Sequence, residues 1–360
     1  MKKKLPADHS ATFSRFLVTV LSLIVGAISS SAYGETALDE SVFTDAIDTA
    51  EDMPRLRSLL ISQNDQIVVE KYFNGQNARR KANVKSVSKS IISALVGIAI
   101  EKGYIANVDE PISTHFGPLI PDYSGTAKEH ITVGNLLSMQ AGLETTSFYN
   151  YGKWVLSDNW VRFALDQPLR AEPGTKLQYS TGNTHLLSAI LTQATGKTTL
   201  AFAREVLAGP LGFELAPWPR DPDGIYFGGN NMELTPRQML AFGLLYLNEG
   251  QRNGNQVIPA TWVETSFTPL AESAREEGRF YGYGWWMREM AGYPTTFAWG
   301  YGGQFILLVP KLDLVVVTTS SSLPGNNRRA HIRSLYALLE DKVVRPAATV
   351  ATPPNIEADD

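Results

Sequence analysis

The sequence predicts an α/β fold of the α+β kind, in which an antiparallel sheet flanked by helices carries a mainly helical inserted subdomain. Three observations support this prediction. Residues of about 55–80 and of about 280–320 are rich in β-branched and aromatic residues, and about 86–270 reads mainly as helices and loops. Strand-rich segments at both ends of the chain predict one sheet with the helical block inserted between them. We expect a functional site where the sheet meets this insert.

The first strand-rich segment reads as a hairpin. Two β-rich runs, 58–63 and 66–73, are separated by Asn64-Asp65, and Asn74-Gly75 follows the second run. A two-residue Asn-Asp connection between such runs is typical of a tight β-hairpin turn.

An apolar run follows Ser86 and fills residues 91–100. Because its apolar residues fall on nearly all sides of a helix, we expect a buried helix that extends to Lys102 and ends at Gly103. The segments that read as further helices are 132–139, 184–195, 236–248 and 261–267.

The C-terminal part predicts strands over 280–287, 304–309 and 314–319, with a turn over 310–313 between the last two. A helix over 327–344 is expected to end at Arg345-Pro346, since the residue before a proline disfavours helix. The remaining residues, 346–360, are predicted to be a solvated tail.

The N-terminus reads as an export signal. Lys2, Lys3, Lys4 and Arg15 precede an uncharged run over 16–32 that ends in small residues. This pattern predicts a signal peptide over 1–34, followed by one domain over 35–345 and a periplasmic or secreted location. An uncleaved membrane anchor is the alternative; with the signal removed, we expect no membrane span.

Composition excludes several classes of function. The chain has 360 residues, a net charge of −4 and no cysteine. An acidic chain lacks the basic surface that nucleic acid requires, and the missing thiols exclude disulfides, cysteine zinc sites and thiol catalysis. The five histidines lack metal-ligand spacing, and His185 is expected to pack rather than to line a site. We therefore expect no metal and no cofactor.

Ser86 and Lys89 form the one Ser-x-x-Lys pair in the chain. On a helix this spacing places both side chains on one face. A lysine followed by apolar residues is expected to be buried, and burial lowers its pKa towards that of a useful base. The pair therefore predicts a nucleophile with its base, and the backbone amide of Ser86 is a candidate oxyanion donor. The alternative is a helix-capping serine followed by a solvated lysine.

Two later motifs offer partners for this pair. Tyr179-x-Thr181, with Asn183 beyond, precedes a helix, and the tyrosine hydroxyl is a candidate proton relay. A core tyrosine with a satisfied hydroxyl is the alternative. The run Tyr301-Gly302-Gly303-Gln304 precedes a strand; its glycines permit close approach of the backbone, so the Gln304 amide is the predicted second oxyanion donor. An ordinary loop entering a strand is the alternative there.

Taken together and in this order, the motifs resemble those of the serine β-lactamase and penicillin-binding-protein superfamily, on the branch of class C β-lactamases, related esterases and 6-aminohexanoate-dimer hydrolases. The resemblance covers about residues 55–340. It rests on Ser86-x-x-Lys89, on the Tyr179 motif, on Tyr301-Gly302-Gly303 in the slot of the Lys-Thr-Gly motif, and on supporting stretches at 131–143 and 210–213. The resemblance implies a β-lactamase/transpeptidase-like fold.

Two departures from the family pattern bear on the substrate. Thr181 stands where the family has an asparagine, with Asn183 two residues further on, and Tyr301 stands where the family has a lysine or histidine. In family members that act on β-lactams, that cation helps to bind the substrate carboxylate. The departures therefore favour an ester or a small linear amide over a β-lactam.

These observations predict a serine hydrolase in which Ser86 attacks a carbonyl, Lys89 is the base and Tyr179 relays the proton. Thr181, Asn183, Tyr301, Gly303 and Gln304 are the predicted substrate-binding and oxyanion residues. Two alternatives stay open. One is a peptidoglycan DD-peptidase, D-aminopeptidase or weak β-lactamase, and the other is a non-catalytic binding or sensor domain. The expected partner is a small ester, amide or peptide, and the sequence does not determine the oligomeric state.

Overall fold

The computed structural model describes residues 39–117, 119, 125–325 and 327–351. The predicted signal peptide over 1–34 lies outside these residues, as does the end of the predicted tail over 352–360.

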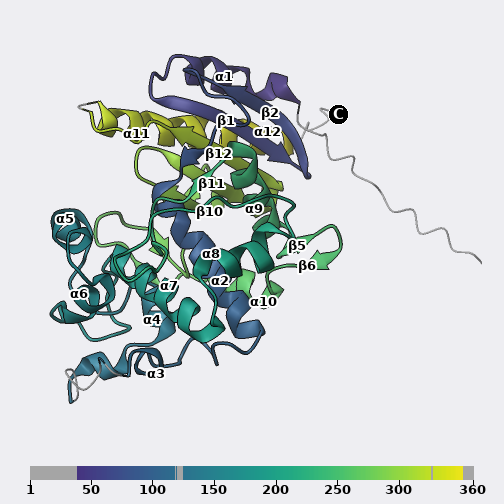
Figure 1. The fold of residues 1–360 in the computed structure, drawn as a ribbon. Helices are drawn as coiled ribbons and strands as arrows, with labels where there is room; N and C mark the ends of the chain where they lie inside the picture. The colour runs from purple at the N-terminus through teal and green to yellow at the C-terminus, as the bar shows by residue number, and fades with distance from the viewer. Residues whose placement is uncertain (1–38, 118, 120–124, 326, 352–360) are drawn as a thin grey trace, which may run out of the picture. The chain divides into compact units, whose positions relative to one another are not determined.

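The main sheet of the described residues has eight antiparallel strands in the spatial order β2-β1-β12-β11-β10-β9-β8-β7 (Figure 1). Strand β1 pairs with β12, so the two ends of the chain share one sheet, as the sequence predicts. The strands are β1 (Leu56–Gln63), β2 (Gln66–Tyr72), β7 (Ala271–Glu272), β8 (Phe280–Tyr281), β9 (Trp286–Met290), β10 (Tyr293–Gly300), β11 (Gln304–Val309) and β12 (Leu314–Ser320).

Two small two-stranded sheets complete the β structure described. They pair β3 (Ala82–Asn83) with β4 (Glu233–Leu234), and β5 (Gln251–Arg252) with β6 (Asn255–Gln256).

The predicted hairpin over β1 and β2 is confirmed. Asn64 and Asp65 have φ of 49° and 59°, the left-handed backbone that a tight two-residue hairpin turn requires. Asparagine and aspartate tolerate this backbone better than other side chains do, which explains why the turn falls at this pair.

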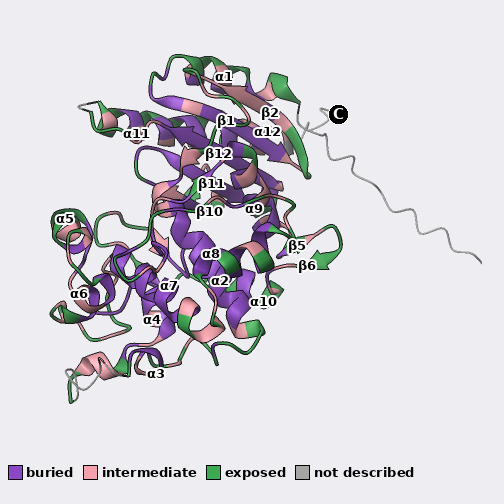
Figure 2. Ribbon diagram, in the orientation of Figure 1, coloured by how far each residue is buried: buried purple, intermediate pink, exposed green. Residues whose placement is uncertain are grey.

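Helices cover both faces of the sheet. Alternate residues of β11 enter two separate cores: Ile306 belongs to the core that contains residues of α2, α7 and α9, whereas Phe305 belongs to the core that contains residues of α1 and α11. Burial on both faces explains the apolar runs 305–309 in β11 and 314–317 in β12, and Figure 2 shows these strands in the buried colour. No helix of the described residues is both long and apolar enough to cross a membrane. The α-helices are α1 (Thr44–Glu51), α2 (Ser88–Glu101), α3 (Ser113–Phe116), α4 (Val133–Leu137), α5 (Tyr151–Val155), α6 (Trp160–Asp166), α7 (Thr181–Thr195), α8 (Thr199–Ala203), α9 (Pro236–Leu247), α10 (Ala260–Ser266), α11 (Arg328–Ala337) and α12 (Arg345–Ala351).

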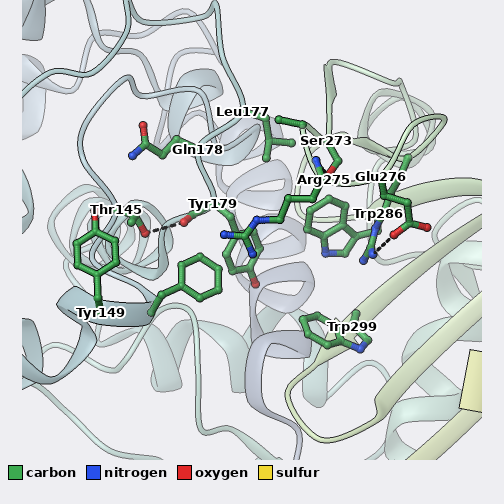
Figure 3. Close-up of a pocket in the computed structure, with 13 residues that line it drawn as sticks. Thr145, Tyr149, Leu177, Gln178, Tyr179, Ser273, Arg275, Glu276, Trp286 and Trp299 are labelled. Carbon is green, nitrogen blue, oxygen red and sulfur yellow. Dashed lines mark hydrogen bonds and ion pairs between the residues drawn. The ribbon is translucent and has the colours of Figure 1, made fainter. Parts of the chain in front are cut away.

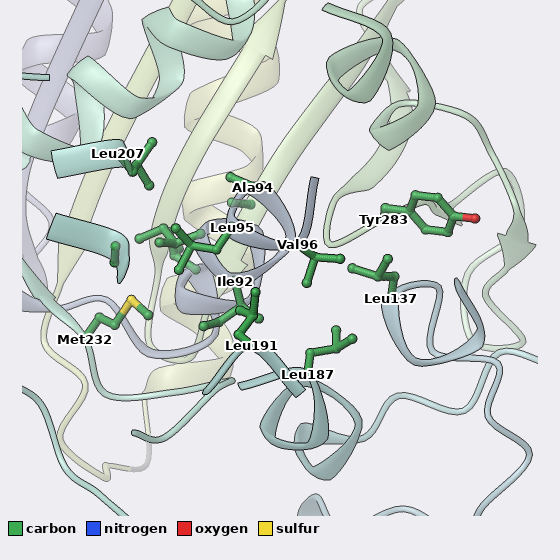
Figure 4. Close-up of a cluster of buried hydrophobic side chains, with 14 of the residues drawn as sticks. Ile92, Ala94, Leu95, Val96, Leu137, Leu187, Leu191, Leu207, Met232 and Tyr283 are labelled. Atoms are coloured by element: carbon green, nitrogen blue, oxygen red, sulfur yellow. The ribbon is translucent and has the colours of Figure 1, made fainter. Parts of the chain in front are cut away.

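Helix α2 lies at the centre of the larger core. All its residues from Ser88 to Ala99 are buried, as its apolar sequence predicts. Figure 4 shows Ile92 and Leu95 of α2 beside Leu187 and Leu191 of α7. Burial of a helix on every side fixes its N-terminal end in the protein interior, and Ser86 and Lys89 lie at that end.

The sheet extends further than the sequence predicts. The single predicted strand over 280–287 is two strands, β8 and β9, separated by a bend at Gly284, whose φ is 83°. Strand β10 was not predicted at all, because Pro294 and two threonines interrupt its apolar pattern. Pro294 is the second residue of β10 and is exposed, a strand-end position that tolerates a missing N–H donor.

The predicted end of the C-terminal helix is wrong. Helix α11 continues without a break through a π-helical segment, η8 (Leu338–Val344), into α12, and Ala347 of the predicted tail is fully buried. Pro346 does not end the helix for two reasons. The π-helical segment before it changes which carbonyl each backbone N–H reaches. Pro346 is also the second residue of α12, and a proline in the first turn of a helix is tolerated because the N–H it lacks is not required there.

Candidate active site

Ser86 and Lys89 meet at the N-terminal end of α2. Ser86 lies in a 3-10 turn, η2 (Lys85–Val87), and Lys89 lies in the first turn of the α-helix. Lys89 Nζ donates to Ser86 Oγ over 3.3 Å. Ser86 is half-buried, so a substrate carbonyl can reach its hydroxyl, whereas Lys89 is 1% exposed. The predicted nucleophile and base are therefore in contact.

Lys89 is held by oxygen atoms that carry no full charge. Its Nζ donates to the carbonyl oxygen of Gly229 over 2.5 Å and to Thr181 Oγ1 over 3.3 Å, and it lies 5.1 Å from the centre of the Tyr179 ring. Burial without a compensating carboxylate lowers the pKa of Lys89 from 10.5 to about 7. Near neutral pH, a large fraction of Lys89 is therefore an uncharged amine that can accept a proton.

Tyr179 is the third member of this cluster. The Ser86 side chain is near enough to the Tyr179 hydroxyl to affect its pKa, and the Tyr179 ring stacks on Trp286 with 5.8 Å between ring centres. Burial raises the pKa of Tyr179 to about 12, although the Ser86 side chain acts in the opposite direction. Tyr179 therefore keeps its proton at neutral pH. It is a proton donor there, and Lys89 is the stronger candidate for the base.

The two predicted site residues after the tyrosine, Thr181 and Asn183, have different surroundings. Thr181 is 4% exposed, and its hydroxyl contacts both Lys89 Nζ and, at 2.9 Å, Ser147 Oγ. Asn183 is buried in α7, and in the described part of the chain no hydrogen bond joins it to Ser86, Lys89 or Tyr179. The structure thus brings Thr181 to Lys89, the predicted base, but does not bring Asn183 there.

The glycine-rich motif forms the hairpin between β10 and β11. Tyr301 is 38% exposed beneath the Arg328 guanidinium, and a side chain at Gly303 would meet Ser320 and Leu335. The Gln304 side chain is bound to both backbone groups of Ser320. Strand β11, which begins at Gln304, lies against the η2 turn, but within the described residues no hydrogen bond joins this motif to Ser86. The oxyanion role of the Gln304 amide therefore stays a prediction.

Gly300, the last residue of β10, is the part of this hairpin that touches the serine turn. A Cβ atom at Gly300 would lie 2.2 Å from the carbonyl oxygen of Val84, two residues before Ser86. Only glycine permits this approach, which brings the end of β10 against the turn that carries Ser86, the predicted nucleophile.

A cavity of about 500 Å³ opens beside Tyr179 (Figure 3). Its size falls within the range of roughly 300–1,000 Å³ that is usual for small-molecule sites. The cavity is lined by residues of the insert, of the loop before β8 and of strands β9 and β10. Its lining residues are Thr145, Phe148, Tyr149, Leu177, Gln178, Tyr179, Ser273, Ala274, Arg275, Glu276, Arg279, Trp286 and Trp299.

His185 does not line this cavity. It is fully buried in α7, where its Nε2 lies 2.9 Å from Asp221 Oδ2, and its Nδ1 faces the backbone N–H of Gly228 at 3.4 Å. The pair supports the loop that precedes Gly229. Among the described residues, no cluster of histidine, aspartate and glutamate has the arrangement of a metal site.

Comparison with known proteins agrees with this geometry. A family profile described as Beta-lactamase matches residues 57–340, which is most of the chain. The chain belongs to the beta-lactamase family of serine hydrolases.

Relatives within the beta-lactamase family are distant. A 6-aminohexanoate-dimer hydrolase of Paenarthrobacter ureafaciens is 24% identical over 300 residues, which cover 76% of this chain and 74% of that protein. A solved structure from Bacillus anthracis is named a putative 6-aminohexanoate-dimer hydrolase. It has 22% identity to this chain and a TM-score of 0.65, and the match covers 79% of each chain. EstCE1, a hydrolase with promiscuous acyltransferase activity, has 18% identity and a TM-score of 0.64 over 82% of this chain and 97% of its own.

Within this beta-lactamase-family site, the sequence did not reveal Gly229. A Cβ atom at Gly229 would lie 2.9 Å from Lys89 Nζ and 2.2 Å from Thr184 Oγ1, so glycine is needed for its carbonyl to reach the lysine. The sequence feature that could have indicated a close backbone approach is the glycine pair Gly228-Gly229, in a segment that otherwise reads as a loop. Ser147, which binds Thr181, also lies in such a segment and has no signal of its own.

Proposed function

We propose that this chain cleaves an ester or a small linear amide through an acyl-enzyme formed on Ser86. The observation that carries the proposal is the contact between Lys89 Nζ and Ser86 Oγ at 3.3 Å, with burial lowering the pKa of Lys89 to about 7. A base of that pKa accepts a proton near neutral pH and returns it later in the cycle.

In the acylation step, Ser86 Oγ attacks the carbonyl carbon of the substrate while its proton passes to Lys89. The C–O or C–N bond of the tetrahedral intermediate then breaks, and Tyr179 gives its proton to the leaving oxygen or nitrogen. Lys89, which lies against the Tyr179 ring, returns the proton to the tyrosine. The products of this step are the free alcohol or amine and an ester on Ser86.

Deacylation repeats the same proton transfers with water as the nucleophile. Water loses a proton to Lys89 and attacks the acyl carbon. The bond from the acyl carbon to Ser86 Oγ then breaks, the protonated Lys89 returns the proton to Ser86 Oγ, and the acid leaves. The amide of Ser86 and a second amide from the hairpin between β10 and β11, for which the sequence predicts Gln304, would hold the negative oxygen in both steps. One such donor is typically worth about 10²–10³ in rate.

The choice of an ester or small linear amide rests on two residues. Tyr301 occupies the slot in which family members that act on β-lactams carry a cation, and a tyrosine is not a cationic residue. Thr181 rather than an asparagine contacts Lys89. The names of the relatives, a 6-aminohexanoate-dimer hydrolase and a hydrolase with promiscuous acyltransferase activity, are in keeping with this choice.

The proposal is tested with the purified protein and a p-nitrophenyl ester. We expect wild type to show a burst of p-nitrophenol. After quenching, the intact mass of the protein should increase by one acyl group, and mass spectrometry of a digest should place that group on the peptide that contains Ser86. Ser86→Ala should give neither. Undiminished hydrolysis by Ser86→Ala would overturn the proposal.

Two further reagents separate the alternatives. A fluorophosphonate probe labels an activated serine, so a non-catalytic domain would stay unlabelled. Labelled penicillin that is retained by wild type and displaced by a D-amino-acid amide would indicate a peptidase instead of an esterase. We expect labelling by the fluorophosphonate alone.

We also propose that the protein is exported to the bacterial periplasm, on the strength of the N-terminal pattern over 1–34. N-terminal sequencing of protein from a fractionated cell tests this. A mature chain that begins near residue 33 or 35 supports the proposal, and an intact N-terminus in the membrane fraction supports the anchor.

A further inference from the structure

The cavity beside Tyr179 has an aromatic wall and a small number of charged groups. Phe148, Tyr149, Trp286 and Trp299 line it together with Tyr179. Its charged lining side chains are Arg275, Glu276 and Arg279, all from the segment between β7 and β8. The net charge of these three side chains determines whether the cavity favours an anionic, a neutral or a cationic ligand.

The negative charge of Glu276 is balanced by two neighbouring guanidinium groups. Its Oε2 accepts from Arg279 Nη1 over 2.9 Å, and its Oε1 accepts from Arg288 Nη1 over 2.8 Å. Both carboxylate oxygens are therefore engaged by guanidinium groups, one of which also lies 3.6 Å from Glu340. The cavity consequently keeps a surplus of positive charge.

The two lining arginines have donors to spare. Among the described residues, Arg275 has no carboxylate partner; it is exposed, and its guanidinium lies 4.8 Å from the centre of the Phe148 ring. Figure 3 shows the Arg275 side chain extending across the cavity towards Tyr179. Arg279 stacks on Trp286 at 4.2 Å, and its buried Nε has no acceptor.

We propose that this cavity binds a carboxylate carried by the substrate, with Arg275 as the principal partner and Arg279 beside it. The substrate class is an ester or amide in which an apolar chain or ring separates the carboxylate from the scissile bond. The apolar part lies on the aromatic wall, and the charged end meets a planar guanidinium, which suits a carboxylate. Arg275 is thus a specificity-determining residue. The inference rests on the serine hydrolase function proposed above.

The test compares anionic and neutral esters of matched size. One pair differs in the acyl group, mono-p-nitrophenyl adipate against p-nitrophenyl hexanoate. The other differs in the leaving group, p-acetoxybenzoate against phenyl acetate. For each pair the measured quantity is the ratio of kcat/KM, anionic to neutral, after division by the uncatalysed rates. The pair that shows the preference tells which side of the scissile bond occupies the cavity.

We expect wild type to prefer the anionic member of at least one pair, and Arg275→Gln to reduce that ratio about tenfold, the effect of losing one charge-assisted contact. Arg275→Lys, which keeps the charge, should retain more of the preference. Raising NaCl from about 50 mM to about 500 mM should also lower the wild-type ratio, because Arg275 is exposed and its field is screened.

The matched control is Arg333→Gln, which removes the same charge from the exposed side of α11 and should keep the wild-type ratio. A thermal melt of each variant checks that the fold is intact. Two results would overturn the inference: no anionic preference in wild type, or an unchanged preference in Arg275→Gln. Failure of wild type to hydrolyse any of the esters would instead count against the proposed function.

Discussion

The carbonyl oxygen of Gly229 accepts a hydrogen bond from Lys89 Nζ over 2.5 Å, from a loop that is far from Lys89 in the sequence. A carbonyl dipole orients the amine without adding a negative charge beside it. A carboxylate in that place would raise the pKa of Lys89 and keep it protonated. The loop therefore positions the amine towards Ser86 while leaving it able to act as a base.

Gly229→Ala is expected to reduce activity by much more than its small size suggests. The new Cβ would lie 2.9 Å from Lys89 Nζ and 2.2 Å from Thr184 Oγ1, so the loop must move and its carbonyl loses the lysine. We expect kcat to fall by about 10²-fold, because Lys89 would no longer lie within hydrogen-bonding distance of Ser86. Steady-state kinetics on a p-nitrophenyl ester measure this. Gly152→Ala in α5 is the matched control, since a Cβ there meets nothing within 4 Å; equal losses in both variants would count against the positioning role.

The pH dependence of acylation should report Lys89. Its amine must be uncharged to accept the Ser86 proton, and its pKa is about 7. We therefore expect kcat/KM to fall as pH decreases below about 7 and to level off above it. Lys89→Arg keeps its charge at every accessible pH and should lose about 10²–10⁴-fold in rate.

Lys102→Arg is the control for that substitution, because Lys102 is an exposed lysine at the other end of α2. It should reproduce the wild-type profile. A wild-type profile that stays flat through neutral pH would show that another group is the base.

The same buried amine makes the folded state less stable. In the unfolded chain Lys89 holds its proton up to about its ordinary pKa of 10.5, whereas in the folded state it releases the proton near 7. Between these two values the unfolded state binds more protons, so wild-type stability should rise with pH relative to Lys89→Met. The rise is at most about 1.4 kcal/mol per pH unit.

Urea unfolding of both proteins over a series of pH values from about 6 to about 10 measures this difference. Below about pH 7 the difference in unfolding free energy should be constant and should favour Lys89→Met. Ser86→Ala, which removes no titrating group, should show no such pH-dependent difference from wild type. A constant difference between wild type and Lys89→Met across the whole range would mean that Lys89 stays protonated in the folded state.

Local patterns in the sequence were enough to predict part of the fold. The apolar run of α2 and the Asn64-Asp65 turn depend on neighbouring residues, and both are confirmed. Strand β10 depends on its partner β11 instead. Its Thr295 and Thr296 are buried by tertiary packing that no local pattern expresses. The same holds for α12. Pro346 locally disfavours a helix there, but the burial of Ala347 stabilises the helix through tertiary packing.

The site shows the same division. Ser86 and Lys89 are close in sequence, so their contact follows from helical spacing. The position of Tyr179 was predicted from the motif, but its proximity to Ser86 requires the long-range packing of α7 against α2. Gly229 contributes only a backbone carbonyl, and because every residue has one, the residue type at this position does not predict the contact with Lys89. For Gln304 the sequence predicts a backbone amide, and its contribution to the oxyanion stays a prediction.

Thr181 tests how the site works without the family asparagine. Its hydroxyl contacts Lys89 Nζ at 3.3 Å and Ser147 Oγ at 2.9 Å. Thr181→Val keeps the shape but removes an acceptor that favours the charged amine, so the pKa of Lys89 should fall further. We expect the acidic limb of the kcat/KM profile to move to lower pH, with a loss of less than about tenfold on the plateau, the effect of one hydrogen bond. Thr181→Ser keeps the hydroxyl and should restore the wild-type profile. If the limb stays in place in Thr181→Val, the hydroxyl does not tune the lysine and serves only to hold Ser147.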